Sequence, residues 1–217
     1  ELLQLHSQDE LLLFPFLSLL NNIHREIETL KNNNVKEIYS YLNIGSIEDF
    51  RSYYDEYSAF TLGEYENWDE EKWIDVSNKE WQEFISKRVD ELSQKGIDGF
   101  FIDNTDVFYV YPSDEIYQGI IDILSEVKKT NKGVIINGGD CFVKKYIETG
   151  NAIKLFDGVN QEGVYTQYDF SKQKCKLNDQ ENRDYYTDYL DMVLLNGYRV
   201  YVLEYATNSG IKDKAYS

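Results

Sequence analysis

The sequence is poor in the residues that build metal centres and disulfide scaffolds. Its 217 residues include two cysteines, two histidines, two prolines and one methionine. Cys141 and Cys175 cannot make a disulfide framework, and no CxxC or Cys/His spacing indicates a structural zinc site. No run reaches the roughly 18 to 20 apolar residues that a membrane span needs. We therefore expect no metal, no cofactor and no membrane-spanning segment.

Positive charge is also scarce. Lys and Arg number 22 against 39 Asp and Glu, which gives a formal net charge of −17. Such a surface repels a phosphate backbone and an anionic membrane face, which argues against nucleic acid as a partner. A neutral or cationic partner suits it better, although acidity can also serve solubility alone. The chain lacks an initiating Met, a basic leader and a signal-like apolar segment, so we interpret it as part of a longer protein. We also expect it to be a monomer.

Aromatic residues are abundant, with 19 Tyr, 11 Phe and 3 Trp. Flat amphipathic rings suit a sugar-binding groove, and they also fill hydrophobic cores. Trp68, Trp73, Tyr65 and Tyr109 are candidate platforms for stacking sugars, with packing as the alternative for each. An Asn-, Lys- and Tyr-rich composition is typical of an AT-rich bacterial genome.

Hydrophobic periodicity predicts short strands that alternate with amphipathic helices. The predicted strands are Leu2–Ser7, Glu10–Phe16, Glu37–Ile44, Gly99–Asp103, Val134–Asn137, Gly158–Gly163 and Val200–Ala206. The predicted helices are Ser18–Asn32, Asn78–Lys95, Asp114–Thr130, Cys141–Thr149 and Asp184–Asn196. Because no Pro/Gly/Ser-rich linker interrupts this pattern, we predict one domain over residues 1–217 with a parallel α/β sheet.

The predicted strands end in polar residues, which favours a (β/α)8 TIM-like barrel over an open sheet. Carboxylates or carboxylate-rich loops follow the third, fourth, sixth and seventh strands, and Asn137 ends the fifth. In a barrel all these ends face one mouth, whereas an open sheet gathers its site at one switch point. No Gly-rich phosphate loop marks such a point.

Two places fit the barrel poorly. Only Gln8 and Asp9 separate the first two predicted strands, whereas a parallel crossover needs at least about 10 residues. Either the first run is not a barrel strand or residues are missing near positions 7–10. The chain also ends where an eighth strand is due, so we expect a barrel that is incomplete at its N-terminal units and at the eighth strand.

Several linked motifs resemble glycoside hydrolase family 114 over roughly Tyr39–Ala206. They are Tyr41–Arg51 (YLNIGSIEDFR), Trp73–Asp75 (WID), Gly96–Asn104 (GIDGFFIDN) with Asp106 after it, Asn137–Gly138, and Glu162–Tyr165 (EGVY). The resemblance implies a TIM barrel that hydrolyses α-1,4 linkages in a galactosamine-containing polysaccharide, of the galactosaminogalactan or Pel kind. An unacetylated polymer of this kind is cationic, which the acidic surface would suit. It also implies an extracellular or surface-attached enzyme, because its substrate lies outside the cell.

Most glycosidases need two carboxyl groups, one protonated and one ionised, that flank the scissile bond. Asp103 and Glu162 end two predicted strands, and the resemblance implies that they are the catalytic pair. Aromatic Tyr165 near Glu162 favours Glu162 as the general acid and Asp103 as the nucleophile or base, and the opposite assignment stays open. The alternatives are a turn-capping Asp103 and a solvated Glu162.

Six further residues are candidate substrate contacts, each with a structural alternative. Glu48 and Arg51 are spaced for an ion pair. Asp106 and Asn137 also suit turns. Glu204 lies among apolar residues, where an acid has either a partner or a function. Tyr165 is the sixth candidate. His6 could serve a subsite as a strand-end residue.

Three function classes therefore stay open. The first is a glycoside hydrolase that uses two carboxylates. The second is a catalytically inactive carbohydrate-binding barrel, and the third is an interaction domain of a surface protein.

Overall fold

The computed structural model describes residues 3–5, 11–14, 23–33, 35–66, 68–169, 172 and 174–206. The chain divides into two compact units, Glu1–Asp157 and Gly158–Ser217. The predicted single domain over residues 1–217 stays a prediction. In the described part of the chain, no helix is long and apolar enough to cross a lipid bilayer.

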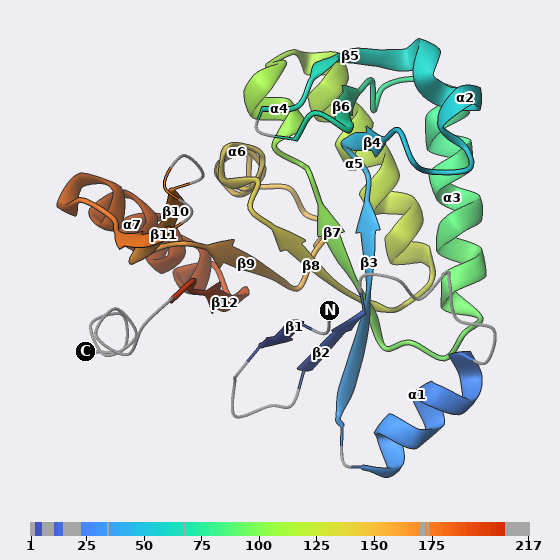
Figure 1. Cartoon of the computed structure of the whole chain (residues 1–217), viewed down its shortest axis with the longest axis horizontal. Coiled ribbons are helices and arrows are strands. Elements are labelled where there is room, and N and C mark those ends of the chain that lie inside the picture. Colours follow the sequence, from blue (N-terminus) through green and yellow to red (C-terminus); the bar gives the residue numbers. More distant parts are fainter. Residues whose placement is uncertain are drawn as a thin grey trace. The chain divides into compact units, whose positions relative to one another are not determined.

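The first unit is built on a sheet in the order β1-β2-β3-β7-β8 (Figure 1). Its strands are β1 (Leu3–Leu5), β2 (Leu11–Phe14), β3 (Glu37–Asn43), β7 (Gly99–Asp103) and β8 (Gly133–Asn137). The pairs from β2 to β8 are parallel, as predicted. In the register of β3 and β7, Tyr41 lies opposite Phe101 and Asn43 opposite Asp103. The carboxyl ends of these two strands therefore meet, which brings their polar terminal residues together.

The first two strands are antiparallel, with Leu3 opposite Leu13 and Leu5 opposite Leu11. An antiparallel pair needs no crossover, so the short spacing between them requires no missing residues. The first run is thus a hairpin partner of β2 and not a parallel barrel strand. The predicted absence of an eighth strand stays a prediction, because residues 207–217, which follow the last described strand, lie outside the described residues.

Helices pack on the sheet of the first unit, as the amphipathic pattern of the sequence predicts. They are α1 (Ile23–Asn32), α3 (Lys79–Ser93), α5 (Asp114–Lys129) and α6 (Asp140–Glu148), with the short α2 (Tyr54–Tyr57), η2 (Ser58–Phe60) and α4 (Val107–Val110). The Asn78 side chain caps α3 by accepting hydrogen bonds from the Glu80 and Trp81 amides. Gly96 follows the helix with φ 87°. These are the predicted start and stop signals. Helix α3 contacts α5 (Figure 1), and its buried residues form part of the core.

A small antiparallel sheet lies beyond the carboxyl ends of β3 and β7 (Figure 1), and the sequence pattern did not predict it. It has the order β4-β6-β5, from β4 (Ser46–Glu48), β5 (Thr61–Glu64) and β6 (Glu71–Ile74). Backbone hydrogen bonds join it to the large sheet. The Ile44 N–H donates to the main-chain carbonyl of Asp103, and the Ile74 N–H donates to the main-chain carbonyl of Gly45. The small sheet is thereby fixed over the end of β7.

Gly45 allows this close approach. A Cβ at this position would lie 1.8 Å from the carbonyl oxygen of Asn104. We expect Gly45→Ala to force the chains apart and to cost about 1–3 kcal/mol of unfolding free energy, as other overpacked sites do. Thermal unfolding should then show a Tm lower by at least about 2 °C. A variant that melts with the wild type would show that the loop relaxes at no cost.

The second unit contains β9 (Gly158–Glu162), β10 (Thr166–Asp169), β11 (Lys174–Leu177), α7 (Gln180–Leu195) and β12 (Arg199–Leu203). Strands β9 and β12 are parallel, with Glu162 opposite Leu203, and β10 and β11 form an antiparallel pair. Helix α7 begins four residues before the predicted start at Asp184. The reason is Asp179, whose side chain accepts from the Asn182 amide and caps the helix there.

Candidate functional site

Asp103 ends β7 with hydrogen-bond donors on both carboxylate oxygens. Tyr41 donates its phenol to Oδ2 at 2.7 Å. Asn137 Nδ2 and the Asn104 backbone N–H each donate to Oδ1 at 3.0 Å. Because these donors come from three strand ends or the turn after them, the carboxylate has a fixed orientation and a fixed supply of hydrogen bonds.

Tyr41 belongs to the site although it was not among the predicted residues. Burial, together with the charge of Asp103 and the hydrogen bond to it, raises the pKa of Tyr41 above its ordinary value. The phenol therefore stays protonated and remains a donor to Asp103. The signal in the sequence was its place on β3, two residues before Asn43, which is paired with Asp103.

Asp106 lies on the turn after β7 and contacts the turn after β8. Its two oxygens both accept from the Gly139 backbone N–H at 3.1 Å. Burial first, and then the charge of Asp103, raise the pKa of Asp106 from 3.8 to about 7. The predicted residues Asp103, Asp106 and Asn137 are thus brought together at the carboxyl ends of β7 and β8.

The raised pKa of Asp106 predicts a specific pH dependence of stability. Between about pH 4 and pH 7 the folded chain keeps a proton on Asp106 that the unfolded chain has released. Stability contributed by this group therefore falls as the pH rises through that window. Asp106→Asn is neutral throughout and keeps an oxygen that accepts from Gly139. We expect the Tm of the variant minus that of the wild type to increase from about pH 4 to about pH 7. A difference that does not change with pH would contradict this.

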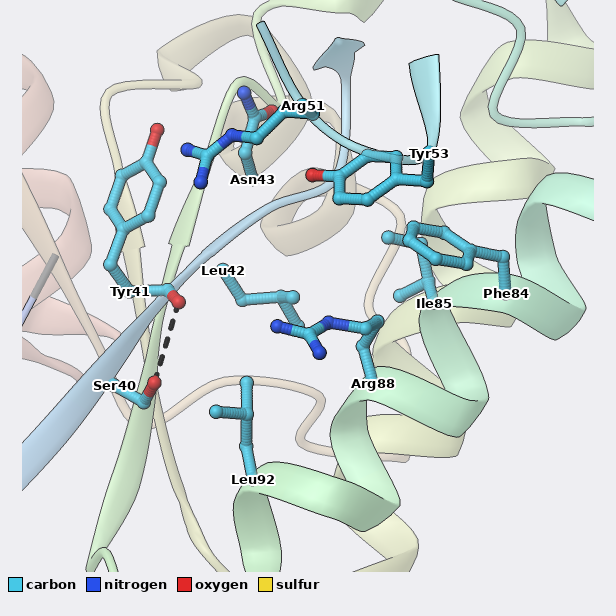
Figure 2. A pocket seen from close by; sticks show the side chains of 10 residues that line it. All are labelled: Ser40, Tyr41, Leu42, Asn43, Arg51, Tyr53, Phe84, Ile85, Arg88 and Leu92. Atoms are coloured by element: carbon cyan, nitrogen blue, oxygen red, sulfur yellow. Dashed lines mark hydrogen bonds between the residues drawn. The ribbon is translucent and has the colours of Figure 1, made fainter. Parts of the chain in front are cut away.

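Glu48 and Arg51 form the predicted ion pair. Arg51 donates Nε to Oε2 at 3.1 Å and a terminal nitrogen to Oε1 at 2.7 Å. Figure 2 shows Arg51 with Tyr41 and Asn43 among the residues that line a cavity of about 40 Å³. The hydrogen bond and the charge of Glu48 raise the pKa of Arg51 further, against the effect of burial. The pair lies beside Tyr41, which donates to Asp103.

Sequence reasoning missed a polar network next to Asp103. Its centre is Glu71 on β6, whose Oε1 accepts from Ser46 Oγ and, at 3.2 Å each, from Asn43 Nδ2 and Asn104 Nδ2. Tyr65 donates its phenol to Asn104 Oδ1 at 3.0 Å. Since the members come from β3, β4, β6 and the loops after β5 and β7, no single local motif contains the whole network.

In the second unit, Glu162 ends β9 and accepts a hydrogen bond from the Tyr205 phenol. Glu204 follows β12 and binds the turn after β9. Its Oε1 accepts from the Tyr165 N–H and its Oε2 from the Thr166 N–H, each at 2.8 Å. Glu204 thus holds the backbone beside Tyr165, whose own side chain is 38% exposed.

The candidate stacking residues divide into buried and exposed rings. Trp73 is buried, and Tyr65 stacks on it with ring centroids 4.2 Å apart. Trp68 and Tyr109 are 52% and 69% exposed. Trp68 and Tyr109 can offer a ring face to a sugar without rearrangement. His6 lies outside the described residues.

Comparison with known proteins adds independent findings. The sequence model of glycoside-hydrolase family GH114 matches residues 16–217. No curated protein matches the sequence.

Solved structures also resemble this one. The glycoside hydrolase domain of PelA from Pseudomonas aeruginosa is 17% identical with a TM-score of 0.78, over 96% of this chain and 81% of that one. Ega3 from Aspergillus fumigatus, solved in complex with galactosamine, is 17% identical with a TM-score of 0.68, over 89% and 74%. The trehalose-6-phosphate hydrolase TreA from Bacillus licheniformis is 12% identical with a TM-score of 0.56, over 82% and 43%. The shared fold confirms the predicted α/β, TIM-barrel-like class.

Proposed function

The chain belongs to glycoside hydrolase family GH114, and from this premise we propose that it cleaves α-1,4 linkages in a galactosamine-containing polysaccharide through Asp103 and Glu162. The match over residues 16–217 is the observation that carries the proposal. The resemblance of the fold to the PelA hydrolase domain and to Ega3, which was solved with galactosamine, supports the substrate class. A net charge of −17 suits a polymer whose free amines are cationic.

The environment of Asp103 supports its role as the ionised member of the pair. Three donors, from Tyr41, Asn137 and the Asn104 amide, converge on its oxygens. This arrangement suits an anion that attacks the anomeric carbon or activates water. Tyr41 and Asn137 then position the carboxylate.

Glu162 is proposed as the general acid. In this role its proton passes to the glycosidic oxygen while the bond from that oxygen to the anomeric carbon breaks. Water then delivers a hydroxyl to the anomeric carbon and a proton to the base, so that hydrolysis is complete without a cofactor. Tyr205, which donates to Glu162, would orient the carboxyl group.

The remaining candidates contribute to substrate binding in different ways. Tyr165 offers an exposed ring. Glu48 and Arg51 lie beside Tyr41, which donates to the proposed ionised carboxylate, and Asp106 interacts with that carboxylate through its charge. Both oxygens of Glu204 bind backbone amides, so we propose that it acts by holding Tyr165 in place. A matrix polysaccharide lies outside the cell, and we accordingly propose an extracellular or surface-attached monomer.

The function is tested by measuring new reducing ends on three polymers. They are a deacetylated α-1,4-galactosamine polymer, its N-acetylated form and an α-1,4-glucan. We expect release from a galactosamine polymer and none from the glucan. A folded protein that binds the galactosamine polymer without cleaving it would instead be a carbohydrate-binding barrel.

A further inference from the structure

Glu71 is a partly buried carboxylate without a cationic partner among the described residues. In the register of β4 and β6 it lies directly opposite Glu48. Like charges directly opposite each other destabilise a sheet. Glu48 is neutralised by its ion pair with Arg51, whereas the donors to Glu71 in the described part of the chain are neutral. The fold therefore keeps a negative charge at a place where the described residues supply no cationic partner.

The two oxygens of Glu71 differ. Oε1 accepts from Ser46, Asn43 and Asn104. Oε2 accepts from none of the residues that the structure describes, and the side chain is partly exposed. Burial, and to a smaller degree the charges of Glu48 and Asp103, raise the pKa of Glu71 above its ordinary value. A cation at Oε2 would offset this cost, because a charge-assisted hydrogen bond is among the strong ones.

Glu71 also lies next to the proposed catalytic carboxylate. Asn104 connects the two, since its side chain donates to Glu71 and its backbone N–H to Asp103. On the other side, the Glu71 N–H donates to the carbonyl of Trp68, an exposed ring, at 3.0 Å. Glu71 thus offers a carboxylate oxygen on a segment that also carries an exposed indole, next to a fixed carboxylate. An amino sugar needs such a combination, with a charge for its amine and a flat face for its ring.

We propose that Glu71 binds the ammonium group of a galactosamine unit through Oε2 and so makes the site prefer deacetylated over N-acetylated sugar. This inference rests on the proposed function. An ammonium group brings three donors and the missing positive charge. An acetamide brings one N–H and no charge, which leaves the carboxylate uncompensated. Glu71 is a specificity-determining residue in this scheme, and Asp103 and Glu162 carry out the chemistry.

The test compares Glu71→Gln with the wild type on defined oligosaccharides of galactosamine and of N-acetylgalactosamine. Gln keeps an oxygen for the three neutral donors and removes only the charge. We expect the kcat/KM on the deacetylated oligosaccharide to fall roughly tenfold to a hundredfold, the range for a hydrogen bond to a charged group. Affinity for the acetylated oligosaccharide, measured by calorimetry, should not fall. The Tm should be equal or higher, because the repulsion from Glu48 is relieved.

Two controls accompany this variant. Glu70→Gln makes the same charge change at the exposed neighbouring position and should leave kcat/KM unchanged. Glu71→Asp keeps the charge and should keep the preference for the deacetylated ligand, whatever its own Tm. Equal losses for both ligands in Glu71→Gln would indicate a structural role and overturn the inference, as would no loss at all. A wild type that neither binds nor cleaves a galactosamine polymer would instead overturn the proposed function.

Discussion

Replacing Asp103 by Asn is expected to lower turnover of the galactosamine polymer by roughly 10³-fold or more, the scale seen when a nucleophile or its base is removed. The amide keeps the volume of the carboxylate and one acceptor oxygen but cannot attack or take a proton. In the variant, Tyr41 and Asn137 still face a side chain of the same size, although its oxygen carries a smaller negative charge than the carboxylate. We therefore expect only a small change in Tm. Turnover is measured by mass spectrometry of released oligosaccharides, and stability by thermal unfolding.

A matched control separates catalysis from loss of charge. Asp90 lies in the last turn of α3 and has an exposed side chain. Asp90→Asn makes the same chemical change and should turn over substrate like the wild type. If Asp103→Asn kept wild-type turnover while folded, Asp103 would be a turn-capping residue and not part of the catalytic pair.

Glu162→Gln is expected to lower turnover of the polymer by roughly 10²- to 10⁴-fold, the usual contribution of a positioned general acid. The assignment of roles predicts a further difference between the two variants. An aryl α-galactosaminide with a good leaving group needs little protonation, so Glu162→Gln should recover much of its turnover on that substrate. Asp103→Asn should not, because the attack on the anomeric carbon is still impaired.

Exposed Glu181, in the first turn of α7, provides the matched control in the same unit. Glu181→Gln should leave both substrates unaffected. Recovery of Asp103→Asn and not of Glu162→Gln on the aryl substrate would reverse the two roles. Full activity of Glu162→Gln on the polymer would remove Glu162 from the mechanism.

Elements with a complete local signal could be predicted from the sequence. The run Gly99–Asp103 follows a helix that ends near Gly96, and it is strand β7 at the predicted residues. Asn78 caps α3 as predicted. The small sheet escaped prediction because β4 has three residues and β6 begins with two charged ones, so neither shows an apolar period. Its stability comes from long-range contacts, such as that of Gly45 with the Asn104 backbone.

The positions of the candidate residues were predictable where a residue ends a strand. Asp103, Asn137 and Glu162 each end a parallel strand, and Asp106 follows in the next turn. Tyr41 and Glu71 were missed because their importance depends on register and on partners far away in the chain. The spacing of Glu48 and Arg51 predicted their ion pair, but it could not indicate that Glu71, opposite Glu48, has no cationic partner among the residues that the structure describes.

The most direct test of the hydrolase function is one incubation of partly deacetylated galactosaminogalactan with the wild type, Asp103→Asn and Glu162→Gln. Mass spectrometry of the soluble products and sedimentation of bound protein with the polymer are read from the same samples. We predict oligosaccharides from the wild type only, with all three proteins bound to the polymer. Binding by all three without products from any would contradict hydrolysis and leave a carbohydrate-binding barrel.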